Sequence, residues 1–419
     1  MKSGDFLDKL LDGIEVEWNS VSDIFHLKNG YTPSKSSNEY WTDGTIHWFR
    51  MDDIRENGQI LGDSLQKVSA SAVKGGKLFP ANSIIISTSA TIGEHALITV
   101  PHLANQRFTC LALKSAHIDS FDIKFLFYYC FLLADWCKKN TTMSSFASVD
   151  MDGFRKFPIP IPCPENPKKS LEIQAEIVRI LDTFTELTTE LTAELTAELT
   201  ARKKQYNYYR DQLLSFEEGD VEWKTLGDVA NFANGKGHEQ SIAEDGKYIV
   251  VNSKFISTDG KVAKFCNEQL CPLFIDDILI VMSDLPNGKA LSKTFIVDMD
   301  EKYTLNQRIG AISAKNKNEL LPRFLYYFLN RTQQLLKHDN GADQTNLRKD
   351  QILGVQVPIP PLTEQARIVA ILDKFDALTN SITEGLPREI ALRQKQYEYY
   401  RDLLLRFPKP EEAPIKGKR

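Results

Sequence analysis

The most regular pattern in the chain is a series of apolar positions between residues 173 and 216, separated mostly by three or four residues. Alternating steps of three and four are typical of a helix packed along a coiled-coil seam. Successive steps of four, as in the TAEL quartets at 188–201, predict that the supercoil unwinds locally. Gly and Pro are absent from 168 to 216, so the stretch can form one helix. The predicted seam includes Leu187, Leu191, Leu195 and Leu199.

The same helical pattern returns near the C-terminus. The segment IVRILDTFTELT (177–188) recurs as IVAILDKFDALT (368–379), and QYNYYRDQLLSF (205–216) recurs as QYEYYRDLLLRF (396–407), each 191 residues later. Gly385 and Pro387 predict a break or kink in the second copy. From periodicity alone, a helix that merely buries a leucine stripe explains the pattern as well as a spacer does. The matched lengths favour the spacer, since 28 residues between equivalent points span roughly 42 Å, about one turn of B-DNA.

The duplication extends into the segments between the helices. VEW at 16–18 and 221–223, NQR at 105–107 and 306–308, and PIP at 160–162 and 358–360 form a shared frame, whereas the residues inside the frame differ. Residues 8–18 also echo 211–223, which suggests a closed, pseudo-two-fold ring with neighbouring termini. The predicted order is an N-terminal helical segment (1–15), a first domain (16–164), a spacer helix (165–216), a second domain (217–361), a second spacer helix (362–407) and a flexible tail (408–419).

Composition fits a multidomain globular protein, with 419 residues of which 42% are hydrophobic and 26% charged. The net charge of −5 argues against a simple nucleic-acid coat, so contact with DNA would need local basic patches. The first residues lack the pattern of a signal peptide, and the longest apolar run, 125–134, is far shorter than the roughly 20 residues of a membrane span. A cytoplasmic location is therefore expected.

Motifs of enzymes, cofactor sites and metal sites are not found in the sequence. The six cysteines form no CxxC pair, which predicts neither a metal site nor a disulfide framework. PNGKAL (286–291) lacks the upstream Gly and the following Ser or Thr of a phosphate-binding loop. The segment FANGKGH (232–238) is interpreted as a turn whose glycines permit positive φ. HExxH, NPPY and convincing Ser/His/Asp sets are absent. We predict no catalytic residue, no metal ligand and no cofactor bound by this chain.

Taken together, the TAEL quartets at 188–201, the segments 159–182 and 202–216, and NSITEGLPREIALRQKQYEYYRDLLLRFP (380–408) resemble the specificity subunits of type I restriction-modification systems. The resemblance covers essentially the whole chain and is strongest to the class with TAEL repeats, type IC. It implies a mixed α/β fold, with two target-recognition domains separated by two long helices that form an antiparallel coiled coil in a pseudo-two-fold circular arrangement.

The function implied by this resemblance is recognition of DNA. Each domain would read one half of an asymmetric, two-part site in double-stranded DNA, and the helices would fix the unread gap. Each helix-domain unit would receive one methyltransferase (modification) subunit, which binds S-adenosylmethionine and methylates adenine. Restriction subunits would supply translocation and cleavage driven by ATP with magnesium. Adding or removing a TAEL quartet would change the gap.

Residue types that read base edges or hold phosphates define the candidate DNA-binding residues. For each one, a solvated loop or a capping side chain is an equally good explanation. In the first domain the candidates are Thr32, Ser34, Lys35, Trp48, Arg50, Thr88, Ser89 and Arg107, and in the second they are Lys236, His238, Asn252, Lys254, Asn287, Lys289, Arg308, Gln344 and Asn346. Arg107 and Arg308 belong to the shared NQR motif. They are expected to be structural or to hold phosphates, because shared residues cannot specify different half-sites.

The tyrosine-rich helix ends are expected to form core and partner-binding surface, with DNA stacking as the alternative. The residues concerned are Tyr206, Tyr208 and Arg210 in the first copy and Tyr397, Tyr399 and Arg401 in the second. Two rival hypotheses remain for the whole chain. A coiled-coil scaffold would pair two protein ligands without touching DNA, and a fused enzyme subunit would turn over a cofactor by itself.

Overall fold

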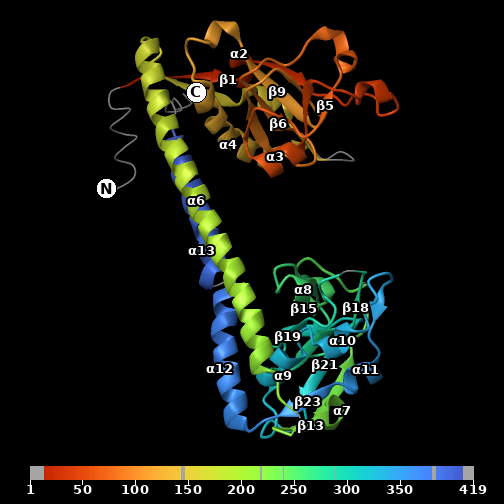
Figure 1. The fold of residues 1–419 in the computed structure, drawn as a ribbon. Helices are drawn as coiled ribbons and strands as arrows, with labels where there is room; N and C mark the ends of the chain where they lie inside the picture. The colour runs from red at the N-terminus through yellow and green to blue at the C-terminus, as the bar shows by residue number, and fades with distance from the viewer. Residues whose placement is uncertain are drawn as a thin grey trace, which may run out of the picture. The chain divides into compact units, whose positions relative to one another are not determined.

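The computed structural model describes residues 14–142, 147–217, 219–238, 240–286, 288–379 and 384–408. Its contacts divide the chain into two compact units, Met1–Leu191 with Arg393–Arg419, and Thr192–Leu392. Each unit combines one mixed α/β domain with parts of the long helices (Figure 1). The predicted fold class, two α/β domains joined to long helices, is confirmed.

The first domain is built on a five-stranded sheet of order β2-β9-β6-β7-β4 and a three-stranded sheet of order β5-β3-β8, in which β3 and β8 are parallel. Successive side chains of a strand point to opposite faces, so Ile84 and Ile86 pack with helix α4 whereas Ile85 packs with Phe49 on the other face. The strands are β1 (Val16–Ser20), β2 (Phe25–Asn29), β3 (Ile46–Phe49), β4 (Ile60–Leu61), β5 (Lys67–Val68), β6 (Ser83–Ser87), β7 (His95–Ile98), β8 (His102–Ala104), β9 (Phe108–Leu113), β10 (Thr141–Thr142), β11 (Ser148–Val149) and β12 (Pro158–Pro162); the helices are α2 (Val21–Ile24), α3 (Met51–Asn57), α4 (Ile123–Lys139) and α5 (Met151–Lys156), with 3-10 turns at Asn38–Tyr40, Ala70–Ala72, Lys74–Gly76 and Ser115–His117.

The second domain repeats this topology. Its sheets have the orders β14-β21-β17-β19 and β16-β15-β20, and β15 and β20 are again parallel. Ile278 and Ile280 face one core while Leu279 and Val281 face the other. The strands are β13 (Glu222–Thr225), β14 (Ala230–Asn234), β15 (Tyr248–Val251), β16 (Lys264–Cys266), β17 (Ile278–Val281), β18 (Ser283–Asp284), β19 (Thr294–Ile296), β20 (Tyr303–Leu305), β21 (Ile309–Ala314), β22 (Thr345–Asn346) and β23 (Gln356–Ile359); the helices are α7 (Leu226–Val229), α8 (Ser253–Ser257), α9 (Pro322–Leu329), α10 (Gln333–Leu336) and α11 (Lys349–Leu353).

The repeated VEW and PIP motifs pair with each other in both domains. In the antiparallel ladder of β1 and β12, Trp18 lies opposite Pro160, and in that of β13 and β23, Trp223 lies opposite Pro358. Proline cannot donate to a ladder and is therefore confined to edge strands, which suits a two-stranded sheet. These ladders connect the first and last strands of each domain.

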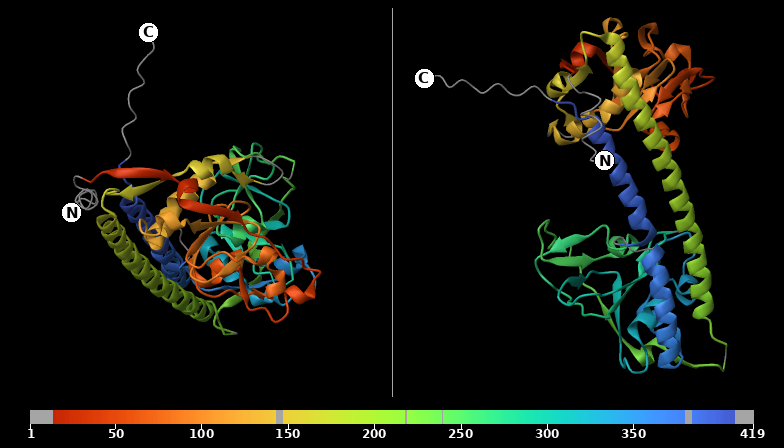
Figure 2. Two further views of the ribbon diagram at one scale, coloured as in Figure 1. Left: turned by 90° about the horizontal axis from the view of Figure 1, so that it is seen from above. Right: turned by 90° about the vertical axis from the view of Figure 1, so that its left-hand side faces the viewer.

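The spacer segments are helical. Helix α6 (Pro167–Leu213) has 47 residues and is one continuous helix (Figure 2). The second segment consists of α12 (Leu362–Thr379) and α13 (Gly385–Leu404). Gly385 has φ +74, and a Cβ there would lie 2.4 Å from the Ala377 carbonyl oxygen. The predicted break near this glycine is confirmed.

The same polar anchor holds each helix to its domain. In the first unit, the Asp182 carboxylate accepts hydrogen bonds from the Tyr128 hydroxyl at 2.7 Å and the Lys124 ammonium at 2.6 Å. In the second unit, Asp373 accepts from the Tyr327 hydroxyl at 2.6 Å and pairs with an arginine of α9 at 2.6 Å. The repeated helix segments therefore use the same aspartate to contact their domains.

The seam of α6 differs from the prediction at one position. Leu191, Leu195 and Leu199 are half-buried, but Leu187 is 56% exposed. Each four-residue step overshoots a full helical turn by about 40°, so leucines at a constant spacing of four rotate away from a common face. Thr185 lies inward instead and is within 2.9 Å of the Tyr397 hydroxyl. The placement of Leu187 on the seam was wrong.

The predicted ring closure is only partly within the described residues, because residues 1–13 lie outside them, as do 409–419 of the predicted tail. Ile14 packs against the first-domain core that also contains Leu404, Leu405 and Phe407. The first and last parts of the described chain thus share one core, as expected for neighbouring termini. No helix among the described residues is long and apolar enough to cross a membrane.

Candidate nucleic-acid interface

A groove of about 670 Å³ in the first domain gathers most of the candidates predicted there. Its lining contains four cationic side chains and one carboxylate, so its charge favours an anionic ligand such as the DNA backbone. We call it the first-domain groove; its lining residues are Thr32, Lys35, Asn38, Trp41, Trp48, Arg50, Met51, Asp52, Arg55, Gln66, Thr91, Asn105, Gln106, Arg107 and Phe108.

Arg50 lies where strand β3 meets helix α3. The fully buried Asp53 accepts hydrogen bonds from the backbone N–H of Arg50 and from that of Leu65, both at 2.6 Å. A buried carboxylate needs such partners because desolvating an unpaired charge is costly. The strand and the carboxylate together fix the backbone from which the Arg50 side chain enters the groove.

Trp48 forms a wall of the groove and is not available for stacking on a base. It is 3% exposed, its indole N–H donates to the Tyr31 carbonyl at 3.0 Å, and Trp41 packs edge-on at 5.1 Å between ring centroids. The Arg50 guanidinium lies 5.6 Å from the Trp48 ring centroid, within the range of a cation–π contact. The expected DNA contact of Trp48 is therefore corrected to support of Arg50.

The NQR motif of the first domain bridges two segments of the groove. The Asn105 amide nitrogen donates to the Thr32 hydroxyl at 3.2 Å, while its side-chain oxygen accepts from the Arg107 backbone N–H at 3.1 Å. Thr32 also contacts Gln106. Asn105 is thus structural, and it directs the exposed Arg107 to the groove.

Three candidates of the first domain do not line the groove. The Ser34 hydroxyl lies 2.7 Å from that of Ser36, the Thr88 hydroxyl lies 3.1 Å from that of Thr109, and Ser89 forms a bridge with a residue of β11. The hydroxyls of Ser34 and Thr88 thus have local partners. None of them is on the lining of the groove.

The second domain brings the corresponding loops together. The Lys236 N–H donates to the Leu305 carbonyl at 3.2 Å, and the Asn306 N–H donates to the Val251 carbonyl at 3.1 Å. The loops that carry Lys236, Asn252 and Arg308 are therefore adjacent, with the side chains of Lys236 and Arg308 exposed. This arrangement repeats the Tyr31–Ala104 and Asn105–Phe49 backbone bonds of the first domain.

The structure gives a different reason for Gly235, the first glycine of FANGKGH, from the one expected from the sequence. It is not among the residues with positive φ. A Cβ at this position would lie 2.0 Å from the Asn306 carbonyl oxygen, just as one at Gly30 would lie 2.3 Å from that of Asn105. The interpretation of Gly235 as a positive-φ turn residue was wrong, because the glycine is required by close approach of two backbones.

Two other candidates of the second domain have side chains that form hydrogen bonds within the domain. His238 is 1% exposed, and its ring nitrogens bond to the Lys236 carbonyl at 2.8 Å and the Thr304 hydroxyl at 3.0 Å. It is structural, which corrects its place among the DNA-binding candidates. The Asn252 side-chain oxygen accepts from the Phe255 N–H at 2.9 Å and caps α8, as expected for asparagine before a helix.

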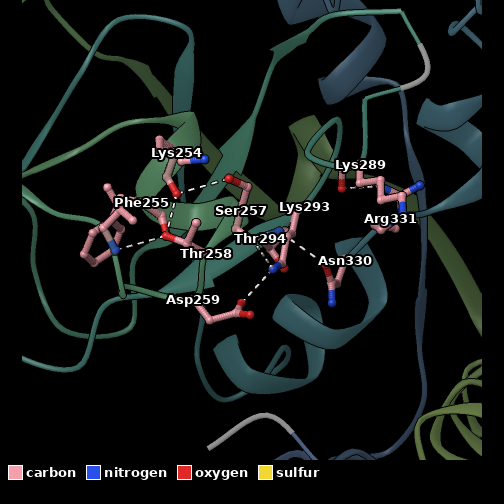
Figure 3. Close-up of polar contacts among 11 residues, drawn as sticks. Lys254, Phe255, Ser257, Thr258, Asp259, Lys289, Lys293, Thr294, Asn330 and Arg331 are labelled. Atoms are coloured by element: carbon pink, nitrogen blue, oxygen red, sulfur yellow. Dashed lines mark hydrogen bonds and ion pairs between the residues drawn. The ribbon is translucent and has the colours of Figure 1, made fainter. Parts of the chain in front are cut away.

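The remaining described candidates of the second domain are exposed, with Lys254 in α8, Lys289 and Gln344 on loops, and Asn346 at the end of β22. The backbone carbonyls of Lys254 and Lys289 are held by neighbours, the latter by the Arg331 guanidinium at 2.5 Å (Figure 3). The Gln344 amide donates to the Ser283 hydroxyl at 2.8 Å, next to Asn346. Asn287 lies outside the described residues. Contact with DNA therefore stays a prediction for this group.

Arg55 and Trp41 are groove residues that sequence reasoning missed. Arg55 is exposed on α3, and Trp41 follows the turn at Asn38–Tyr40. A helix in the segment RMDDIREN would have pointed to Arg55 as a second cation near Arg50. The sequence held no comparable signal for Trp41, which reaches the groove through tertiary packing.

The helix-end tyrosines divide into buried and exposed residues. Tyr206 is 7% exposed, and its burial raises the pKa of its hydroxyl, whereas Tyr208 is 59% and Tyr399 61% exposed. Tyr397 is half-buried, and Arg401 is 6% exposed with its guanidinium 4.2 Å from the Phe131 ring centroid. Tyr206 and Arg401 are thus core residues, a correction to their placement on the partner surface. Arg210, its side chain 18% exposed, lies over the Tyr206 ring at 5.9 Å.

Known proteins share this architecture and sequence. The family described as "Type I restriction modification DNA specificity domain" matches residues 14–201 and 218–392. The chain belongs to this family. It is 49% identical over 407 residues to the type I restriction enzyme EcoprrI specificity subunit of Escherichia coli, covering 90% of this chain and 92% of the relative. It is 36% identical to the EcoR124I/EcoR124II specificity subunit of the same species, covering 98% and 99%.

A solved structure shows the same fold at low sequence identity. Its chain comes from work on the complex assembly and conformational transition of the type I R-M system, with a TM-score of 0.61, 15% identity, and coverage of 93% of this chain and 97% of that one. The protein is accordingly the DNA specificity subunit of a type I restriction-modification system, the non-catalytic part that determines where DNA is recognised.

Proposed function

We propose that each domain of this specificity subunit reads one half of an asymmetric, two-part site in double-stranded DNA. The observation that carries this proposal is the contrast within the repeat. Both domains place the NQR turn beside the residue that follows a parallel strand, yet that residue is Arg50 in one domain and Asn252 in the other. A shared frame with different side chains suits two readers of different sequences.

The long helices fix the unread gap and receive two modification subunits, one at each tyrosine-rich end. The exposed Tyr208 and Tyr399 occupy equivalent positions of the repeat. Two equivalent aromatic surfaces suit two copies of one protein, because tyrosine is enriched at protein interfaces. The TAEL quartets favour membership of the type IC class, in which the quartet number would set the gap length.

The chemistry belongs to the partner subunits. The modification subunits bind S-adenosylmethionine and methylate adenine, while restriction subunits use ATP and magnesium to translocate and cut DNA. This chain binds neither cofactor, and both modification and restriction by the assembled bacterial cytoplasmic complex require it. Its net charge of −5 is compatible with DNA binding, since each domain needs only a local positive groove.

A genome-wide map of adenine methylation tests the proposal. The map compares cells that express this chain with its neighbouring methyltransferase subunit and cells that lack only this chain. We expect a new asymmetric motif in two parts with a fixed gap. Absence of chain-dependent methylation, in cells where the complex assembles, would favour the scaffold hypothesis. Cofactor turnover by the isolated chain would instead revive the fused-enzyme hypothesis.

A further inference from the structure

The four cations of the first-domain groove have different surroundings. Lys35 and Arg55 are exposed, so their side chains are not held in one orientation. Arg107 belongs to the NQR motif, and its counterpart Arg308 occupies the same place in the second domain. These three suit phosphates, which need charge but not a fixed orientation. Arg50 is the exception.

Arg50 packs over a tryptophan ring, and one of its hydrogen-bond donors has no acceptor among the described residues. Its backbone N–H donates to the buried Asp53, and its guanidinium lies over the Trp48 ring. Trp48 is itself fixed by its bond to Tyr31. The Nε atom of Arg50 is buried and has no hydrogen-bond partner among the described residues. The guanidinium forms an ion pair with the exposed Asp52, but the distance from Nη1 to that carboxylate is 3.8 Å, too long for a hydrogen bond.

Because Nε is buried while the side chain is 33% exposed, the planar guanidinium packed on Trp48 can present its two Nη nitrogens to the edge of one base. Guanine offers two acceptors in the major groove, O6 and N7, and arginine can donate to both at once. Adenine offers one acceptor and one donor there, so it cannot accept both bonds. An arginine needed only for phosphate would not require the support of a buried tryptophan and a buried aspartate.

The second domain has a different side chain in the equivalent place. Phe49 precedes Arg50 and Val251 precedes Asn252, and each accepts a backbone bond from the asparagine of its NQR motif. Asn252 is short, and its oxygen caps α8. It cannot reproduce the two parallel donors of an arginine. The difference at this position therefore distinguishes what the two domains can read.

We propose that Arg50 is a specificity-determining residue of the first domain and donates to O6 and N7 of one guanine in the half-site that this domain reads. The inference rests on the proposed function and goes further, since it names the base and the atoms. Arg55, on the same groove, serves as the matched cation that contacts the DNA backbone.

The test uses the assembled modification complex and synthetic duplexes that carry the motif found in the methylation map. Residues 16–164 are exchanged with the corresponding segment of the 49% identical relative to assign one half-site to the first domain. Initial methylation rates are then measured with each base pair of that half-site replaced in turn. In a further set of duplexes, one guanine at a time is replaced by 7-deazaguanine, which lacks the N7 acceptor.

For wild type we expect one guanine whose replacement lowers the rate about ten- to hundred-fold. The 7-deaza substitution should lower the rate at the same position only. Arg50→Ala should lose this discrimination while still methylating the remaining motif, and Arg50→Lys, which keeps the charge but not the planar fork, should not restore it. Arg55→Ala should slow methylation evenly on all duplexes and weaken its salt dependence.

The outcomes separate this inference from the proposed function. If wild type produces no two-part motif, the proposed function fails. If the motif exists but its first-domain half-site contains no guanine on either strand, only the role of Arg50 is overturned. Arg50→Ala with unchanged discrimination at every position overturns it as well. Complex assembly by Arg50→Ala, checked by gel filtration, distinguishes lost recognition from lost folding.

Discussion

Phe184 of α6 and Tyr400 of α13 lie with their ring centroids 6.1 Å apart in the first unit. The second unit contains the same pair as Phe375 of α12 and Tyr209 of α6, at 5.8 Å. Both members are displaced by 191 residues, 184 to 375 and 209 to 400, with the partners exchanged between the helices. The sequence repeat is thus a repeat of helix packing, and each unit uses it to join the two long helices.

The first prediction concerns this packing. Phe184→Ala should lower the free energy of unfolding by about 1–2 kcal/mol, because it removes an aromatic pair together with partly buried apolar area. Leu187→Ala should change it by less than about 0.5 kcal/mol, since Leu187 is 56% exposed. Urea unfolding of the full chain measures both. Equal losses for the two variants would contradict the position of the seam seen in the structure.

The second prediction concerns the spacer. Deleting one quartet, 192–195, should shorten the gap of the methylated motif and leave both half-sites unchanged. Four residues shorten the helix by about 6 Å and rotate it by only about 40° relative to a whole turn. The boundary between the compact units falls at Leu191 and Thr192, within the quartets.

A deletion of two residues, 194–195, is the control for the spacer. It shortens the helix less but rotates the following residues by about 200°, so it should reduce complex assembly. The methylation motif of both variants is read by sequencing. A gap that stays constant in the quartet deletant would end the proposal that the helix measures it.

The third prediction concerns the proposed docking of the modification subunits. Tyr208→Ser and Tyr399→Ser should each leave the fold intact and weaken one of two binding sites by about tenfold or more, because exposed tyrosines at interfaces often carry much of the binding energy. Native mass spectrometry should then find complexes with one modification subunit instead of two. Lys395→Ala, an exposed neighbour, is the control. Full occupancy in both tyrosine variants would count against this surface.

How much of the molecule the sequence could reveal depended on whether the information was local. The constant offset of 191 residues predicted the duplicated helices, and Gly385 with Pro387 predicted where the second one breaks. These features follow from backbone preferences and periodicity within short windows. The orientation of Leu187 could not be predicted in this way, because small rotations per repeat accumulate along α6.

The candidate site needed tertiary structure. Asn105 reaches Thr32 across 73 residues of sequence, and Trp48 bonds to Tyr31. Residue type alone identified Arg50 and Arg107 as DNA-binding candidates, but it could not show that Trp48 and His238 are buried. A polar or aromatic residue in a variable loop has the same sequence signature whether it faces a ligand or completes the core.

The last prediction concerns acid sensitivity of the first domain. His95 and His102 are almost fully buried, at 2% and 0% exposed, and burial lowers the pKa of each to about 4. The positive charge of Arg401 contributes to the lowered pKa of His95. Unfolded histidine takes up its proton near pH 6.5. Stability is therefore complete above pH 6.5 and is lost as the pH falls towards 4, by roughly 2 kcal/mol per histidine at pH 5.

Urea unfolding at pH 7.5 and pH 5 measures this loss. His95→Phe should abolish its share of the loss, because the ring packs between Phe127 and Phe131 at centroid distances of 5.6 and 4.5 Å, an environment that accepts an apolar side chain. The exposed His26 provides the control, and His26→Gln should retain the full difference between the two pH values. If His95→Phe also retained it, the proton uptake would have to reside on another group. His102→Phe would then identify the share of His102, which lies against Phe49 and Phe79 at 5.5 Å each.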